Sequence, residues 1–254
     1  MAASVETAPG ALGRENLSDD GLTWVDVEVG TQTIKVLNWD EVKQGILTLS
    51  GQRLWPAAKL LALLMHFNPD ILEGAKNVLE LGAGLGVVGI AAAKMAANVK
   101  VMITDGEDEV VDLCREHLNR NFEKGQDQPQ CERLFWGEGL DEFKKQHGTF
   151  DLILGSDVVE GKDSLPPFLH TVKELLSSSP TAMCLQTYAE RPYLPHDLIE
   201  RTAEACGLSY TYIEWENQPW AHHMVQTQDP SRWDRFSPRW AKLRIIAWMK
   251  PLSS

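Results

Sequence analysis

The sequence predicts an α/β protein built on a doubly wound sheet, and three observations support this prediction. Residues 76–105 read KNVLELGAGLGVVGIAAAKMAANVKVMITD, in which an apolar strand, a glycine-rich loop, an alanine-rich helix and a second strand follow one another. Strand patterns and helix patterns then alternate through most of the chain. Finally, 254 residues with 43% hydrophobic content suit one such domain with additions.

The part of the chain ahead of the glycine-rich loop is predicted to hold two additions. Residues 1–21 are small and polar, so we expect a disordered lead there. Residues 22–254 would then form a single domain. Its first part, 22–50, is an N-terminal β-hairpin extension, because apolar and polar residues alternate on both sides of the turn Gly30-Thr31.

The remaining elements follow from the same periodic patterns. Helices are expected over 59–67, 87–97, 108–121, 164–176 and 196–206, and strands over 77–81, 99–104, 131–135, 150–155, 181–188, 209–215 and 243–249. The last two strands would pair antiparallel. Residues 216–240 between them are too long for an ordinary hairpin and hold several aromatic residues, so we expect an inserted flap near the entrance of a binding site.

The glycine-rich loop is the strongest candidate for a ligand site. Gly82, Gly84 and Gly86 occupy alternate positions, which lets the backbone pass close to a ligand, and the helix that follows offers free N–H groups. Glu80 and Asp105 stand at the ends of the two flanking strands. The glycines could instead only permit tight packing, but acids at both strand ends favour a nucleoside-bearing cofactor.

Two cofactors fit this loop. The pattern G-x-G-x-x-G at 84–89 matches the dinucleotide fingerprint, and Asp105 lies at a suitable distance to hold a ribose hydroxyl. The longer pattern E-x-G-x-G-x-G at 80–86 resembles motif I of the seven-β-strand S-adenosylmethionine-dependent methyltransferases. An acidic residue beside the loop is tolerable for a sulfonium and poor for a diphosphate. The sequence therefore favours S-adenosyl-L-methionine, with S-adenosyl-L-homocysteine as the product.

Further motifs narrow the resemblance to methyltransferase family 16, the group that includes many lysine-specific protein methyltransferases. Trp-Pro at 55–56 precedes a small-residue helix, W-G-E at 136–138 is similar to the family's W-G-[DE] element, and S-D-V-V-E at 156–160 stands at the place of its D-x-x-[YF] motif. The resemblance covers about 51–215. It implies a seven-stranded, Rossmann-like class I methyltransferase sheet and transfer of a methyl group to a protein lysine side chain.

The resemblance and the positions at strand ends together give the candidate site residues. Asp157 ends a buried strand at the edge where open α/β sheets bind ligands, and it would orient an incoming amine. Tyr188 could supply an aromatic wall for the substrate channel, although core packing is equally plausible for it. These two are the catalytic candidates. The cofactor-binding candidates are Trp55, Glu80, Gly82, Gly84, Gly86, Asp105, Gly106, Trp136 and Ser156.

Several of these positions have a structural alternative. Asp105 could cap the next helix, a common role for aspartate, and Trp136 could belong to the core. Trp55 could either line the cofactor pocket or pack the N-terminal layer. Asn119 and Asn121, at the end of a predicted helix, are interpreted as C-terminal caps rather than ligands.

Glu160 departs from the family pattern, which places an aromatic residue there to shape the lysine channel. An acid could attract a cationic substrate, or it could mean that the acceptor is a histidine, an N-terminal amine or a small molecule. A non-catalytic module that binds the cofactor and holds a partner is a further alternative. A chaperone or a translation factor is the kind of protein partner that we consider.

The composition limits the partners and the location. A net charge of −12 disfavours nonspecific binding to nucleic acid and would attract a basic partner, although solubility alone explains it equally well. The chain has no run of about 18 apolar residues, so we expect no membrane span. Residues 1–20 do not resemble a signal or transit peptide, so a cytoplasmic location is expected, with the nucleus as the alternative.

No metal site and no disulfide framework are expected. The four cysteines are scattered without C-x-x-C spacing, and the adjacent His222 and His223 cannot easily face one metal ion. Nothing in the sequence forms a heptad repeat, so a monomer is the default expectation.

Overall fold

The computed structural model describes residues 22–39, 50–226 and 243–251 and gives them an α/β architecture. Two strands, β1 (Leu22–Val29) and β2 (Gln32–Trp39), form a separate antiparallel hairpin around Gly30 and Thr31, which confirms the predicted extension. The predicted lead over 1–21 lies outside the described residues. The other strands are β3 (Asn77–Leu81), β4 (Lys100–Asp105), β5 (Gln130–Arg133), β6 (Leu152–Ser156), β7 (Met183–Ala189), β8 (Ser209–Ile213) and β9 (Leu243–Met249).

These strands form one sheet in the order β5-β4-β3-β6-β7-β9-β8, in which β9 runs antiparallel to both neighbours. The strand order reverses between β3 and β6, because the chain moves outward from β3 to β5 and then returns to the other side of β3. Such a reversal leaves a crevice at the carboxyl ends of the strands, where open sheets bind ligands. The doubly wound class and the final antiparallel pair are both confirmed.

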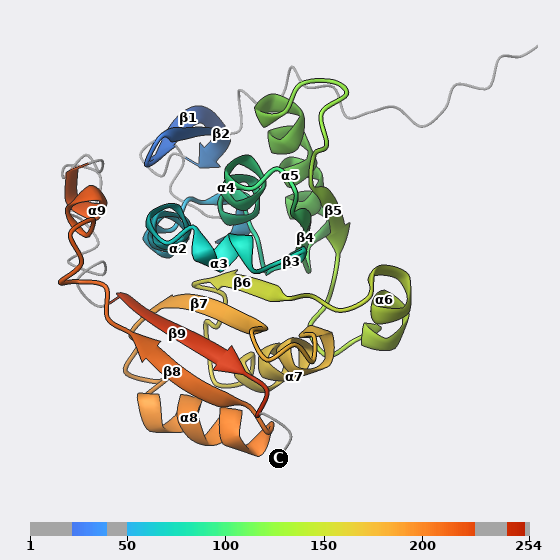
Figure 1. Ribbon diagram of the computed structural model, residues 1–254, viewed down its shortest axis with the longest axis vertical. Helices are drawn as coiled ribbons and strands as arrows, with labels where there is room; N and C mark the ends of the chain where they lie inside the picture. Colours follow the sequence, from blue (N-terminus) through green and yellow to red (C-terminus); the bar gives the residue numbers. More distant parts are fainter. Residues whose placement is uncertain (1–21, 40–49, 227–242, 252–254) are drawn as a thin grey trace, which may run out of the picture.

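Helices cover both faces of the sheet (Figure 1). One face carries α2 (Pro56–Phe67), α4 (Val87–Met95) and α5 (Asp108–Asn121), and the other carries α6 (Leu140–His147), α7 (Leu165–Leu175) and α8 (His196–Ala205). Three short helices complete the described chain: η1 (Ser50–Gln52), α3 (Asp70–Glu73) and α9 (His222–Gln226). No helix in these ranges has both the length and the apolar composition that crossing a membrane requires.

The short helices η1, α3 and α9 are not among the predicted elements, and two longer helices differ clearly from the prediction for identifiable reasons. Helix α2 begins at Pro56 rather than at residue 59, because proline lacks an N–H group and tolerates the first turn of a helix well. Helix α6 is not predicted at all. It has eight residues, of which only Leu140 and Phe143 are buried, so its apolar face is too short to give a clear period.

The inner strands β3, β4, β6, β7 and β9 are buried on both faces, so their side chains alternate between two apolar cores. On β3, Val78 packs in the core under α2, α4 and α5, whereas Leu79 and Leu81 pack in the core against α7. Glu80 lies between Leu79 and Leu81 and therefore points toward α4. The same alternation on β7 separates Thr187 from Tyr188.

Glu80 is a buried carboxyl group that supports the start of α4. Its Oε2 accepts a hydrogen bond of 2.7 Å from the Gly89 N–H, and its Oε1 has no partner among the described residues. A Cβ atom at position 89 would lie only 2.6 Å from Oε2, so glycine is needed for this contact. Burial raises the pKa of Glu80 to about 8, although the Gly89 N–H acts in the opposite direction.

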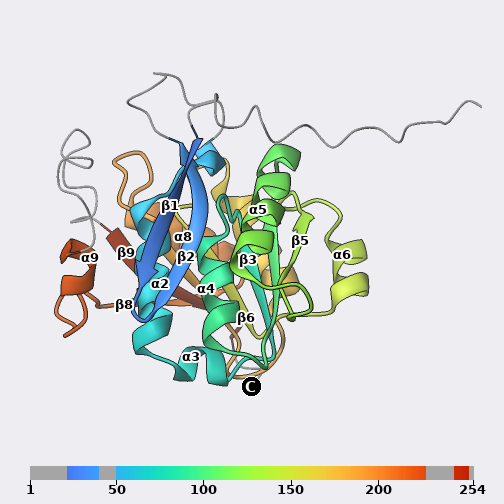
Figure 2. The same cartoon turned by 90° about the horizontal axis from the view of Figure 1, so that it is seen from above.

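The hairpin lies across α2, α4 and α5 (Figure 2). His117 of α5 accepts a hydrogen bond of 2.9 Å from the Leu37 N–H at Nε2, so its proton is on Nδ1, which donates to the Leu85 carbonyl at 2.9 Å. Asn121 accepts from the Lys35 N–H and donates to the Lys35 carbonyl, at 2.9 and 2.7 Å. The predicted capping role of Asn121 is thus incomplete: it also donates to the His117 carbonyl, but its main partner is the hairpin.

We expect Glu80→Gln to remove a pH dependence of stability. The folded protein keeps the Glu80 proton up to about pH 8, whereas the unfolded chain releases it near about pH 4.3. The free energy of unfolding of the native chain therefore falls as pH rises between these values, by at least about 1 kcal/mol in total. In urea unfolding at pH 5, 6.5 and 8, the free energy of unfolding of the variant should rise relative to that of the native chain as the pH increases. A constant difference would mean that Glu80 is ionised throughout.

We expect Asn121→Ala to weaken the docking of the hairpin. The change leaves two backbone groups of Lys35 without their partner and should lower the free energy of unfolding by about 1–3 kcal/mol. Asn119→Ala is the matched control, because Asn119 is exposed on the same helix. Equal stability of the two variants in urea unfolding would contradict the proposed docking contact.

Candidate active site

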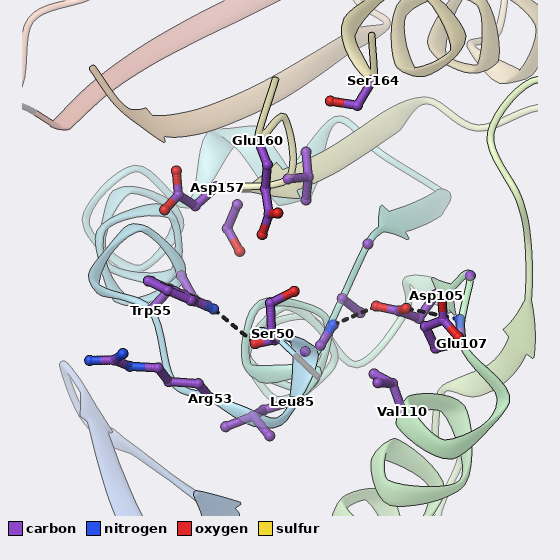
Figure 3. A pocket seen from close by; sticks show the side chains of 18 of the residues that line it. Ser50, Arg53, Trp55, Leu85, Asp105, Glu107, Val110, Asp157, Glu160 and Ser164 are labelled. Carbon is purple, nitrogen blue, oxygen red and sulfur yellow. Dashed lines mark hydrogen bonds between the residues drawn. The ribbon is translucent and has the colours of Figure 1, made fainter. Parts of the chain in front are cut away.

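A cavity of about 470 Å³ lies at the carboxyl ends of β3, β4, β5 and β6. Figure 3 shows that its walls come from different elements: Ser50 and Trp55 precede α2, Asp105 ends β4 and Glu107 follows it, and Asp157 follows β6. This volume is typical of small-molecule sites. Of the predicted site residues, the cavity is lined by Trp55, Gly82, Gly84, Asp105, Gly106, Trp136, Ser156 and Asp157.

The glycine-rich loop forms the floor of the cavity between β3 and α4. Gly84 has φ +53°, and a Cβ atom there would lie 3.0 Å from the Gly51 carbonyl oxygen, so a side chain would be strained in both backbone and contacts. Gly86 does not line the cavity. It has φ +70°, holds the N-cap position of α4 and faces the Cys114 sulfur. Its predicted cofactor contact is therefore replaced by a role in the turn.

Asp105 is largely buried at the end of β4, next to the loop. Its Oδ2 accepts a hydrogen bond from the Gly84 N–H at 2.9 Å, and its Oδ1 accepts one from the Glu107 N–H at 3.2 Å. Burial raises the pKa of Asp105, although these N–H donors oppose the effect. The N-cap position of α5 belongs to Glu107, so Asp105 is not the helix cap. Each carboxylate oxygen keeps a further lone pair for a ligand hydroxyl.

Aromatic side chains form the wall beside Asp105. Trp136 is half-buried and meets Phe168 edge to face, with ring centroids 5.3 Å apart. Phe135 lines the cavity, is 42% exposed and lies under the Arg133 guanidinium at 4.6 Å. Phe135 is not among the predicted site residues, although its position directly ahead of Trp136 could have suggested it. Trp55 closes the opposite side and donates from Nε1 to the Ser50 carbonyl at 3.1 Å.

Asp157 lies at the other end of the cavity in an unusual environment. Its backbone has φ +55°, and its N–H donates to the Thr187 carbonyl at 2.7 Å. Its Oδ1 accepts hydrogen bonds from Arg191 Nη1 at 2.8 Å and from the Ala189 N–H at 3.1 Å. Asp157 is not a helix cap, because Ser164 holds the N-cap position of α7. Glu160 lines the cavity near Asp157 and is exposed (Figure 3).

Two predicted site residues do not line the cavity. Tyr188 is 2% exposed in the core on the α8 side of the sheet, where it meets His196 edge to face, and burial raises its pKa to about 12. Strand alternation is the reason, because Thr187, its neighbour, takes the face toward α2. Glu80 supports the loop from behind. Neither Tyr188 nor Glu80 therefore makes the contact that was expected of it: Tyr188 does not form a wall of the cavity, and Glu80 does not reach the cofactor site.

The described part of the loop over 216–240 packs away from the cavity. Trp220 stacks on Phe67, with ring centroids 5.8 Å apart, and Phe67 ends α2 about 16 Å from the cavity end of that helix. The expected flap near the entrance is therefore wrong for residues 216–226, and the remainder lies outside the described residues. Within the described ranges, no group of three or more His, Cys, Asp or Glu side chains could hold a metal ion.

Comparison with known proteins gives one family match and several relatives. A family model described as lysine methyltransferase matches residues 32–204. The protein N-lysine methyltransferase METTL21A of Danio rerio is 39% identical over 133 residues, which are 52% of this chain and 58% of that protein. The histone-arginine methyltransferase METTL23 of Rattus norvegicus is 33% identical over 141 residues, which are 56% of this chain and 60% of that protein.

The solved structures agree on the fold. The ribosomal protein L11 methylase of Lactobacillus delbrueckii subsp. bulgaricus superposes with a TM-score of 0.54 at 16% identity, over 89% of this chain and 98% of that chain. The chain spans about half to two thirds of the length of the curated relatives that it matches. Because the family match covers more than half of the chain, the protein belongs to the lysine methyltransferase family.

Proposed function

We propose that the protein is an S-adenosylmethionine-dependent N-methyltransferase that acts on a lysine side chain of a protein substrate. The observation that carries the proposal is a single cavity with the glycine-rich loop and Asp105 at one end and Asp157 at the other. When bound, S-adenosylmethionine supplies an electrophilic methyl group: a nitrogen lone pair forms the new bond to carbon, the carbon–sulfur bond breaks, and sulfur keeps that electron pair in S-adenosylhomocysteine.

The residues at the first end fit this cofactor. Asp105 would accept hydrogen bonds from the two ribose hydroxyls with the lone pairs that its N–H partners leave open. Phe135, Trp136 and Val110 provide an apolar wall for the adenine ring. The absence of a side chain at Gly84 lets the backbone around Gly51 approach the loop closely and bound the cavity on that side.

The residues at the second end fit an amine acceptor. A lysine amine with a pKa near about 10.4 costs roughly 4.6 kcal/mol to present in its neutral form at pH 7. Burial in the cavity and the positive charge of a sulfonium both lower that pKa, so a dedicated strong base is not required. Asp157 would accept an N–H of the amine at Oδ2, which has no partner among the described residues, and alignment with the methyl group would supply much of the acceleration.

The choice of lysine rests on the family description, and the nature of the partner on charge. A net charge of −12 and the exposed Glu160 at the cavity favour a basic segment of a protein, with a chaperone or a translation factor as candidates. The proposed enzyme is a monomer, and it has no nucleic-acid or membrane partner. The free cysteines suit a reducing compartment, so we propose a cytoplasmic location, with the nucleus as the alternative.

We expect micromolar binding of S-adenosylmethionine and S-adenosylhomocysteine by calorimetric titration. Gly84→Ala and Asp105→Ala should each weaken both ligands at least about 10-fold, because one strains the loop and the other removes the ribose acceptor. Gly161→Ala is the control, since a Cβ atom there meets nothing within 4 Å. Failure of the native chain to bind either ligand would overturn the cofactor assignment.

We expect transfer of a radiolabelled methyl group to protein lysine in a lysine-rich cell extract, with the modified residue identified by mass spectrometry. Asp157→Ala should reduce this transfer at least about 100-fold while cofactor binding changes little, because the acceptor loses its hydrogen-bond partner. Full turnover by that variant would refute the role of Asp157. A methyl group on arginine, histidine or an N-terminal amine would refute the lysine assignment.

A further inference from the structure

Asp157 and Arg191 form a largely buried ion pair beside the cavity. Their side chains are 6% and 16% exposed, and Arg191 Nη1 lies 2.8 Å from Asp157 Oδ1. The same Nη1 donates to the Ala189 carbonyl at 3.0 Å, and the Ala189 N–H donates to Oδ1 at 3.1 Å. These three contacts close a small ring between the end of β6 and the end of β7. One carboxylate oxygen is thus occupied, while Oδ2 has no partner among the described residues.

The ring surrounds a backbone conformation that needs support. Among the described residues, Asp157 is the one non-glycine residue with positive φ, at +55°. This left-handed conformation costs free energy, and it persists where neighbouring contacts hold it in place. Here the contacts are the Arg191 side chain and the Thr187 carbonyl, which accepts the Asp157 N–H at 2.7 Å. Arg191 therefore helps to fix where the Asp157 carboxylate lies.

The charge of the pair matters for the proposed reaction, because only a neutral amine can accept a methyl group. A buried carboxylate without a counter-charge would stabilise the ammonium form of a nearby lysine and raise its pKa. Arginine stays cationic at all relevant pH values and offers several N–H donors in a fixed plane, so it compensates such a carboxylate permanently. Asp157 can then accept a hydrogen bond from the amine without favouring its protonation.

We propose that Arg191 is a positioning residue for methyl transfer, which holds Asp157 in its strained turn and compensates its charge so that the acceptor amine reacts in the neutral form. This inference rests on the proposed lysine methylation. Two further titratable groups face Arg191: Glu160, from the chain after β6, and Tyr193, from the chain after β7. Both are exposed, so water screens their charges more than that of the buried Asp157.

The test compares Arg191→Met with Arg191→Lys in the full chain. The measured quantity is the rate of tritiated methyl transfer from S-adenosylmethionine into one labelled protein band of a lysine-rich extract, between pH 6.5 and 10. For Arg191→Met we expect at least a 10-fold lower rate at pH 7.5 and a pH–rate midpoint about one unit higher, because the acceptor amine meets an uncompensated carboxylate. Arg191→Lys should restore the native midpoint. Cofactor binding should stay within about 3-fold of the native value in both.

A double variant separates charge compensation from loss of folding. Asp157→Asn added to Arg191→Met removes both charges, and it should return the midpoint toward the native pH even though the rate stays low. An unchanged midpoint in Arg191→Met, or a midpoint that the second substitution does not return, would overturn the role of Arg191. If the native chain itself transfers no methyl group, the proposed function fails, and this inference falls with it.

Discussion

The parallel course of β3, β4, β5 and β6 is the constraint on which the rest of this structure depends. Parallel strands end at one edge of the sheet, so the segments that follow them must meet there even though they lie far apart in the sequence. Residues 82–85, 105–107, 134–136 and 156–158 line one cavity for this reason. The reversal of strand order between β3 and β6 leaves room for a ligand between them, and the two ends of the cavity acquire different carboxylates, Asp105 and Asp157.

The glycine-rich loop and the first turn of α4 are held by three hydrogen bonds from different elements. Glu80 binds the Gly89 N–H from below, Asp105 binds the Gly84 N–H from the side, and His117 donates to the Leu85 carbonyl from α5. Because His117 also accepts the Leu37 N–H, the N-terminal hairpin is connected to the same loop. A loop fixed in this way loses little conformational entropy when a cofactor binds, which favours affinity. The hairpin addition thus contributes to the site without lining it.

The two aspartates at the cavity differ in the groups that balance their negative charge. Asp105 accepts only backbone N–H groups, and its oxygens keep lone pairs for the hydroxyls of a neutral sugar. Asp157 is paired with Arg191, so the acceptor end presents an oriented oxygen with little net charge. Glu160 then remains as the exposed acid at that end, suited to attract a cationic segment from solution rather than to hold the reacting nitrogen. In the proposed function, recognition and chemistry would thus fall to different carboxylates.

The sequence by itself determined the fold class, the hairpin, the family and the residues at the ends of β3, β4 and β6, because glycine spacing and apolar runs are local signals. It could not decide which face of a strand a side chain takes. The side chains of Tyr188 and Glu80 point away from the cavity because side chains alternate between the two faces along β7 and β3. The pairing of Asp157 with Arg191 joins positions 34 residues apart. Only the tertiary structure decided it, since neighbouring parallel strands bring their ends together wherever those ends fall in the chain.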